Sequence, residues 1–542
     1  MSDTTTETAA PTPATGASTA GGGLRPGRFL ARAAAGAAGL TVVAAVLGLV
    51  RDQAVARLFG ASRASDAFLI AWTVPEMAAT LLIEDGMALL LVPAFSHALA
   101  LRAAGGHRAD PVRNLVARTL PRLCAALACA GALLVAGAPW AVGVLAPGLD
   151  DPALAVDCTR LTAVTVFTFG VTGYFSAALR AHGRFLAPAG VYIAYNLGII
   201  ATTLALHARW GVRAAAAGVA VGSVLMILTQ LPTFAGLVLR GRTWVRGRRA
   251  EREALPALLG ATVLAPVVLF VVSRQSQVLV ERVLASSLSE GAISHLNYAQ
   301  KVAQLPMVLS MMICTVTFPV VARAMAAGDV EGARRRVERD LALAGTIVLL
   351  GTSVVIGCAP RIVEVLFQRG AFDAADTAAT AGVMRVYALG LLGHTLVGAL
   401  CRPYFSAGRP TWYPLRAMVA GLVVTAGAGL LLTGPAGVDG IAAANALGIS
   451  TTAVLMLRGL GSHAVAVRPG AVALSLGRPA VAAAVAASAG CLAASWVPGA
   501  VAGLAAGCLL VPAVFLLVSL ALGAPEAVHL LTPVRRRSPH GR

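Results

Sequence analysis

Residues 49–95 read LVRDQAVARLFGASRASDAFLIAWTVPEMAATLLIEDGMALLLVPAF, and this stretch decides the fold of the chain. An apolar run leads into Arg51 and Asp52, and a second long apolar run follows a short turn. A proline and the acidic pair Glu84 and Asp85 interrupt the second run. Ionisable groups inside a membrane span cost on the order of a few kcal/mol each, and they normally face a wet interior or pair with one another. The stretch therefore predicts two membrane helices that carry charge toward an interior.

The composition of the whole chain agrees with this interpretation. Hydrophobic residues make up 58% of the 542 residues, charged residues make up 12%, and the mean hydropathy is +0.79. Many apolar runs of about 20 residues are each long enough to span a bilayer as a helix. The predicted fold class is an all-α polytopic membrane protein.

The formal net charge of +19 is also informative about partners. The arginines lie mainly between the apolar runs, on alternate loops, which is the positive-inside pattern of membrane proteins. They do not form a basic face joined with exposed aromatic residues, so nucleic acid is not expected as a partner. Membrane lipids are the expected partners of such a chain.

The apolar runs predict about fourteen transmembrane helices. Their expected ranges are 33–57, 67–100, 119–145, 159–181, 185–207, 214–240, 255–285, 292–325, 340–367, 377–406, 411–432, 438–459, 474–496 and 500–522. An even number of spans places both termini on one side. Arginine-rich loops follow the even-numbered helices, for example at 242–249 and 334–339, so that side is expected to be cytoplasmic.

An internal repeat divides the chain. Pro93 matches Pro319, Gly183-Arg184 matches Gly408-Arg409, and the offset between the matching positions stays nearly constant. Six helices per unit predict two pseudo-symmetric lobes related by an axis along the membrane normal, which is a transporter architecture. The expected parts are a disordered tail (1–24), an N-lobe (25–250), a C-lobe (251–460), a C-terminal helix pair (461–525) and a basic cytoplasmic tail (526–542).

Several motifs together resemble one family. GLVRDQAVARLFGASRASDAF at 48–68, followed by a proline, an acidic-Gly pair and VPAF, resembles the first two helices of the MurJ/MviN family. Residues 273–309 and 369–391 also resemble that family. The resemblance implies a flippase in the bacterial plasma membrane that moves lipid II, the undecaprenyl-pyrophosphate-linked peptidoglycan precursor, to the outer leaflet by alternating access. It implies a transporter without a cofactor, not an enzyme, in cell-wall biogenesis. Cell-wall synthesis enzymes are a further class of partner.

Arg51 is the first candidate binding residue. It lies about 27 Å along its helix from the expected cytoplasmic end. A guanidinium binds pyrophosphate through two hydrogen bonds and stays charged in apolar surroundings. The resemblance places Arg51 in the central cavity. The alternative is a structural ion pair with Asp52 or Asp66.

Lys301 is the second candidate and the only lysine in the chain. By resemblance, Tyr298-Ala299-Gln300-Lys301 stands where the family commonly has Tyr-Ala-Asp-Arg, so Lys301 replaces a cavity arginine. A second departure lies at 75–81, PEMAATL, where the family usually carries an Arg-Arg pair. The departures leave open another polyprenyl-linked oligosaccharide as substrate, or a non-transporting scaffold for cell-wall synthesis. An exporter of small cations fits less well, because the candidate cavity residues are largely basic.

Further charged residues are candidates for gating or for pairing inside the cavity. By resemblance, Asp66 belongs to the outward gate, and the alternative is an N-cap carboxylate at its helix start. The others are Glu84, Asp85, Arg274 and Arg282. The eight cysteines form no CxxC pair or His/Cys cluster, so no metal site is expected. His394 is expected to serve in packing.

Overall fold

The computed structural model describes residues 26–104, 110–149, 151–239, 261–308, 310, 329–406, 411–463 and 467–523. Every regular element in those ranges is a helix. They are α1 (Pro26–Phe59), α2 (Arg63–Ala79), the π-helix η1 (Thr80–Asp85), α3 (Gly86–Ala104), α4 (Pro111–Ala136), α5 (Ala138–Leu145), α6 (Ala153–Thr162), α7 (Val164–Ala181), α8 (Leu186–Trp210), α9 (Arg213–Leu239), α10 (Ala261–Ala285), α11 (Ala292–Ala303), α13 (Val330–Phe367), α14 (Ala374–Ala388), α15 (Leu391–Ser406), α16 (Tyr413–His463), α17 (Pro469–Trp496) and α18 (Ala500–Ala521). The predicted tails and the 242–249 loop lie outside the described residues.

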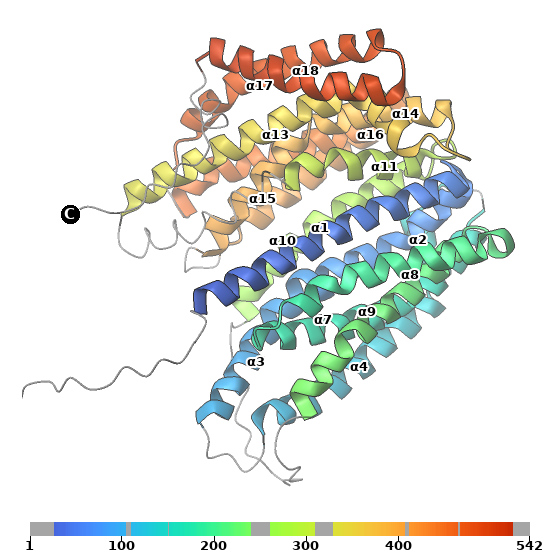
Figure 1. The fold of residues 1–542 in the computed structure, drawn as a ribbon, viewed down its shortest axis with the longest axis vertical. Helices are drawn as coiled ribbons and strands as arrows, with labels where there is room; N and C mark the ends of the chain where they lie inside the picture. Colours follow the sequence, from blue (N-terminus) through green and yellow to red (C-terminus); the bar gives the residue numbers. More distant parts are fainter. Residues whose placement is uncertain are drawn as a thin grey trace, which may run out of the picture.

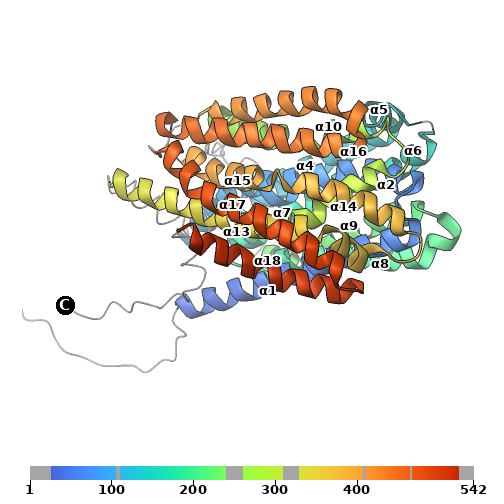
Figure 2. The same ribbon diagram turned by 90° about the horizontal axis from the view of Figure 1, so that it is seen from above.

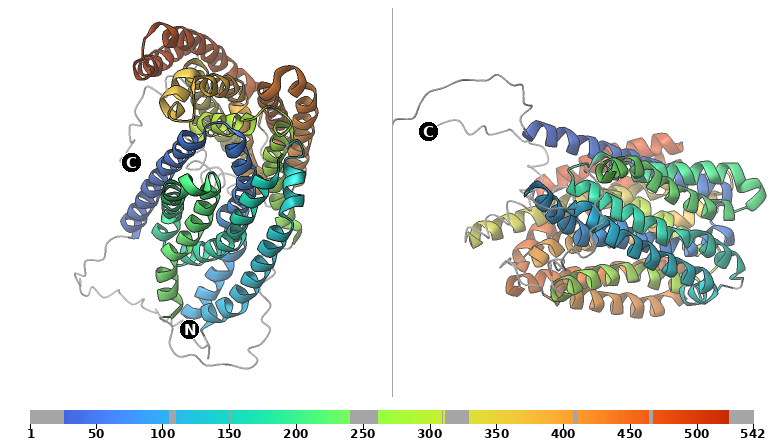
Figure 3. Two further views of the ribbon diagram at one scale, coloured as in Figure 1. Left: turned by 90° about the vertical axis from the view of Figure 1, so that its right-hand side faces the viewer. Right: turned by 90° about the horizontal axis from the view of Figure 1, so that it is seen from below.

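The helices form two groups with roughly parallel axes (Figures 1 and 2). In Figure 1, helices α1 to α9 occupy the lower half and helices α13 to α18 the upper half. Helix α10 packs on α16 and α11 packs on α14, so both belong with the second group. The left view of Figure 3 shows the same division. We call the two groups the first half, α1–α9, and the second half, α10–α18.

A helix break recurs at about the spacing of the sequence repeat. The repeat relates Gly183 to Gly408, an offset of 225 residues. Gly211 follows α8 with φ +55, and Gly437 interrupts α16 with φ +54, at nearly the same offset. These glycines adopt a left-handed conformation that other residues rarely take. The recurrence supports a duplicated helix pattern, while the rotation axis and the lobe boundaries stay predictions.

Candidate membrane spans can be recognised by the length and the apolar composition of each helix. Among the described residues, ten helices are long and apolar enough to cross a membrane, or eleven if the bent pair α14 and α15 is one span. The expected helices 411–432 and 438–459 are the two parts of α16, joined at Gly437. The expected helix 292–325 is described to residue 308 and at residue 310. The count of fourteen therefore remains a prediction.

The second apolar run is broken as its sequence indicates. Pro75 lies inside α2, and the chain then widens into the π-helix η1 before α3 begins at Gly86. A proline removes one helical hydrogen bond, and π-turns often mark functional positions. Gly173 of α7 lies so close to η1 that an added Cβ would clash with the carbonyl oxygen of Leu82. The break is thus fixed by packing against α7.

The outer surface is apolar and carries tryptophans at helix ends. Leu431, Leu509 and many other large apolar side chains point outward. Trp210 and Trp496 end α8 and α17, and the Trp496 side chain is 80% exposed. Trp side chains prefer the interface between the hydrocarbon and the headgroups. This surface is that of a helix bundle surrounded by lipid.

Candidate functional site

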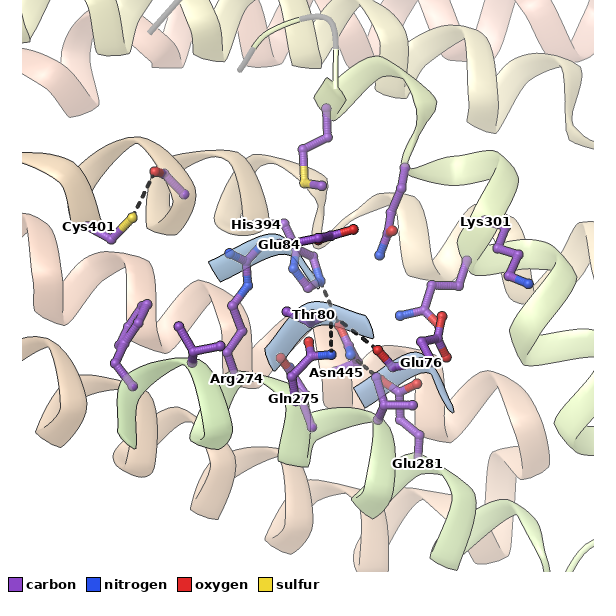
Figure 4. A pocket seen from close by; sticks show the side chains of 18 of the residues that line it. Glu76, Thr80, Glu84, Arg274, Gln275, Glu281, Lys301, His394, Cys401 and Asn445 are labelled. Atoms are coloured by element: carbon purple, nitrogen blue, oxygen red, sulfur yellow. Dashed lines mark hydrogen bonds between the residues drawn. The ribbon is translucent and has the colours of Figure 1, made fainter. Parts of the chain in front are cut away.

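A cavity of about 560 Å³ lies between the two halves, and an adjoining chamber of about 250 Å³ lies within the first half. Helices α10, α11, α15 and α16 line the larger cavity together with α2 and η1 (Figure 4). Helices α1, α2, α7 and α8 line the smaller one, with one residue from α11. Glu76, Thr80, Glu84 and Lys301 line both. We call them the large chamber and the small chamber.

Arg51 and Lys301 meet in one cluster although they lie far apart in the sequence and in different halves. Arg51 donates from Nε and Nη2 to Asp52 Oδ1, at 3.0 and 2.8 Å. Lys301 Nζ lies 3.5 Å from the same oxygen. Trp72 lies beneath both cations, with its ring centroid 4.6 Å from Arg51 Cζ and 5.6 Å from Lys301 Nζ. The carboxylate and the indole face offset the cost of partly burying two positive charges.

Asn196 of α8 fixes the orientation of the guanidinium. Arg51 Nη1 donates to Asn196 Oδ1 at 2.9 Å, and Asn196 Nδ2 donates to the carbonyl oxygen of Ala44 at 3.2 Å. The Arg51 side chain is 12% exposed, and it lines the small chamber. Pairing with Asp52 and a place in the cavity therefore hold together for Arg51 and are not alternatives. Its pairing with Asp66 is not observed among the described residues.

The lining is not largely basic, so that expectation is wrong. Among the described lining residues, the cations Arg51, Arg274 and Lys301 are matched by three carboxylates. These are Glu76, Glu84 and Glu281. Glu76 lies in the segment where the resemblance leads one to expect arginines. Basic residues stand out in an apolar sequence, whereas these carboxylates face the same cavity only because different helices converge there.

The remaining candidates separate into residues inside and outside the cavity. Glu84 and Arg274 line the large chamber, and Glu84 also accepts a hydrogen bond from the Tyr192 hydroxyl at 2.9 Å. Arg282 is buried outside the lining and donates to the carbonyl oxygen of Ile293 at 3.1 Å. The side chain of Asp85 lies outside the described residues.

Asp66 joins the two halves away from the cavity. Its Oδ2 accepts from the Gly291 backbone N–H at 2.8 Å, and its Oδ1 accepts from the Ser294 N–H at 2.8 Å and from Ser294 Oγ at 2.6 Å. Asp66 is therefore a capping carboxylate, but for α11 in the other half. Ser62 caps the helix that contains Asp66. A glycine at the N-cap of α11 has no side chain for this role, so the other half supplies it.

Other backbone contacts close the same end of the interface. Ala371 N–H donates to the carbonyl oxygen of Arg57 at 2.9 Å, and Ala61 N–H donates to Asp376 Oδ2 at 3.3 Å. A Cβ added at Gly370 would clash with the carbonyl oxygen of Arg57. We call residues 57–66, 290–294 and 370–376 the closed end. The two halves approach there to backbone contact.

His394, which was expected to serve in packing, is part of a hydrogen-bond network. Its Nε2 lies 3.1 Å from Asn445 Oδ1 and 3.2 Å from the Tyr387 hydroxyl. Asn445 Nδ2 in turn donates to Glu281, and Gln300 donates to the Tyr387 hydroxyl at 3.0 Å. His394, Asn445, Glu281 and Gln300 of this network line the large chamber (Figure 4). Its members come from five helices, so spacing along the chain carries no signal for it.

Comparison with known proteins shows similarity to one protein family. A family model described as "Lipid II flippase MurJ" matches residues 55–508. A lipid II flippase MurJ of Burkholderia cenocepacia is 28% identical over 441 residues, covering 80% of this chain and 84% of that protein. A probable lipid II flippase MurJ of Haemophilus influenzae is 28% identical over 447 residues, covering 78% and 84%.

Solved structures show the same fold. A lipid II flippase MurJ in an inward closed conformation matches with a TM-score of 0.72 at 18% identity, covering 92% of this chain and 99% of that one. An inward-facing transporter of the multidrug resistance MATE family matches with a TM-score of 0.61 at 16% identity, covering 79% and 95%. The fold is that of a multi-pass membrane transporter.

Proposed function

The chain belongs to the lipid II flippase MurJ family, and we propose that it moves lipid II from the inner to the outer leaflet of a bacterial plasma membrane. The observation that carries the proposal is the cluster of Arg51, Lys301 and Trp72 where the two chambers meet. One cation comes from each half, and a pyrophosphate has oxygens for both. The role is that of a transporter, not of an enzyme.

The geometry suggests how the pyrophosphate binds. Asp52 contacts both cations, at 2.8 Å from Arg51 and 3.5 Å from Lys301. A pyrophosphate oxygen replaces Asp52 at Lys301, while the fork of Arg51, held by Asn196, presents its remaining N–H groups. Substrate binding thereby replaces the direct contact between Asp52 and Lys301 with a contact between the halves that runs through the bound pyrophosphate.

We assign the closed end to the outer face of the membrane. Arginines gather at the opposite helix ends: Arg102 lies in the last turn of α3, Arg180 lies in the last turn of α7, and the expected loop 334–339 lies near the start of α13. Such basic ends remain cytoplasmic. With Asp66 capping α11, the outer exit is shut and the cavity is separated from the outside. Release of the headgroup outward then requires these backbone contacts to part. Cysteine labelling that finds the 242–249 loop outside would overturn the orientation.

Complementation tests the function. The chain is expressed in a strain depleted of its own lipid II flippase, and growth and headgroup accessibility at the cell surface are measured. Restored growth together with outward exposure of the headgroup is expected. A chain that inserts at normal abundance and restores neither would contradict the proposal, and growth without lipid movement would favour a scaffold.

A second candidate substrate is another polyprenyl-linked glycan. Glu76 favours it, because it places a carboxylate in the lining where the family resemblance leads one to expect arginine. Ala79 lines the small chamber, so Ala79→Arg would restore a cation there. If lipid II is the substrate, Ala79→Arg should keep or raise its movement. A variant that loses lipid II movement while staying folded would favour the other glycan.

A further inference from the structure

The large chamber contains a second cation that the pyrophosphate cluster does not use. Arg274 lines the chamber from α10, and among the described residues it makes no hydrogen bond or ion pair. In Figure 4, Arg274 and Lys301 lie on opposite sides of the chamber. A guanidinium presents five N–H donors in a planar fork that matches a carboxylate. Arg274 is thus free to bind an anion on the side away from Lys301.

Gln277 adds an independent observation on the same helix face. It lies three residues after Arg274, so both side chains point to the same side of α10. Gln277 is 4% exposed and lines the chamber, yet its Nε2 has no hydrogen-bond partner among the described residues. An unpaired buried amide donor costs about 1–3 kcal/mol. A ligand oxygen would remove this cost.

We propose that Arg274 and Gln277 form a subsite for a carboxylate on the peptide part of the substrate. The proposal rests on the proposed function, because the peptidoglycan precursor bears a peptide beyond its pyrophosphate and glycan. Anchored at Lys301 by the pyrophosphate, such a headgroup extends across the large chamber to Arg274. A chamber rich in side-chain amides, which include Gln275, Gln300 and Gln304, suits a peptide backbone that both donates and accepts hydrogen bonds.

The carboxylates of the chamber have other partners or other places. Glu281 lies seven residues after Arg274 on α10, about 10 Å farther along the helix axis. Its carboxylate accepts from Asn445 and belongs to the His394 network. Glu76 and Glu84 come from the first half and line both chambers, and Glu84 accepts from the Tyr192 hydroxyl at 2.9 Å. Arg274 and Gln277 therefore define one position in the chamber where an anionic group can bind.

Reconstituted flipping tests the subsite. Purified variants in liposomes move either lipid II with free peptide carboxylates or the same lipid with those carboxylates amidated, and headgroup exposure is timed. Arg274→Gln should slow the free form by about tenfold, the effect of losing one hydrogen bond to a charged group, and the amidated form by less than about twofold. Gln277→Leu should act on the same lipid, with a smaller loss. Arg51→Gln should slow both lipids equally.

The controls separate the possible failures. Arg213→Gln breaks an exposed ion pair with Asp157 outside the chambers and should leave both rates unchanged. Equal losses for both lipids with Arg274→Gln, or no loss, would overturn the subsite. Should Arg274→Gln not reach the membrane, Arg274→Lys still tests it, with a smaller selective loss because the fork is absent. If the unmodified chain moves neither lipid, the proposed function itself fails and the subsite falls with it.

Discussion

The two halves contact each other at the closed end and in the cavity, and these contacts differ in kind. At the closed end, a short carboxylate, Asp66, accepts directly from backbone N–H groups at 2.8 Å and is 7% exposed. In the cavity, Asp52 reaches Lys301 only at 3.5 Å, and the Lys301 side chain is 26% exposed. A short side chain that is hydrogen-bonded to backbone N–H groups fixes the distance between the two halves, whereas a long lysine side chain can change its rotamer. The closed end is specified by backbone position, and the cavity is specified by charge.

This difference predicts how each place responds to substitution. A buried backbone N–H that loses its acceptor must remain unpaired until the halves separate. A cavity cation that loses its partner can still face water or substrate. Substitutions at the closed end should therefore shift the equilibrium between conformations, and substitutions in the cavity should change substrate binding.

Asp66→Ala should have the largest effect. It leaves the backbone N–H groups of Gly291 and Ser294 without an acceptor, while Ser294 Oγ keeps Ser65 Oγ at 2.9 Å. The closed end should therefore lose about 3 kcal/mol or more, over about a hundredfold in the equilibrium. Arg63 and Glu290 form an exposed ion pair across the halves at 3.0 Å. Spin labels that replace both residues would report a longer distance than in the equally labelled protein that keeps Asp66. Asp151→Ala, which removes an exposed carboxylate that caps its own loop, is the control. An unchanged distance distribution would contradict the assigned role.

Arg51→Ala comes next and should act on transport alone. Loss of the fork should cost about 2–3 kcal/mol of substrate affinity, on the order of fiftyfold, while the label distance at the closed end stays the same. Arg51→Lys should be impaired as well, because one ammonium cannot hold Asp52 and Asn196 in the same geometry. Normal flipping by Arg51→Ala at normal abundance would leave Arg51 as a structural partner of Asp52.

Lys301 should give a smaller effect that distinguishes charge from shape. Lys301→Ala removes a point charge and should lower flipping by about tenfold, since one charge-assisted contact is worth about 1.5 kcal/mol. Lys301→Arg should be tolerated, because it restores the cation that the family commonly has there. Flipping in liposomes measures both. A severe loss with arginine would mean that the site depends on the smaller ammonium.

Trp72→Phe should have the smallest effect. The indole face lies under both cations, and a phenyl ring offers a weaker version of the same interaction, so a loss of about 0.5–1 kcal/mol, or about two- to fivefold, is expected. The substrate concentration for half-maximal flipping should rise, with little change at the closed end. A change in the label distance would show that Trp72 supports the packing of α2 instead.

The sequence predicted the elements of the fold better than the pairings within the site. The depth of Arg51 in an apolar run and the break near Glu84 were visible, because charge and proline stand out there. The acidic start of the second helix also predicted a cap. However, the capped helix, α11, belongs to the other half, because local spacing cannot tell which half receives the carboxylate. The partners Asn196 and Asn445 are ordinary polar residues whose importance arises only from packing.

Asp52 has an electrical consequence for the transport cycle. Together, Arg51, Lys301 and Asp52 carry a net charge of one positive unit. A bound pyrophosphate, with about two negative charges at neutral pH, reverses that sign. Moving one charge through the membrane field involves about 2.3 kcal/mol per 100 mV. Within this cluster, binding of the pyrophosphate therefore reverses the sign of the charge on which a membrane potential acts.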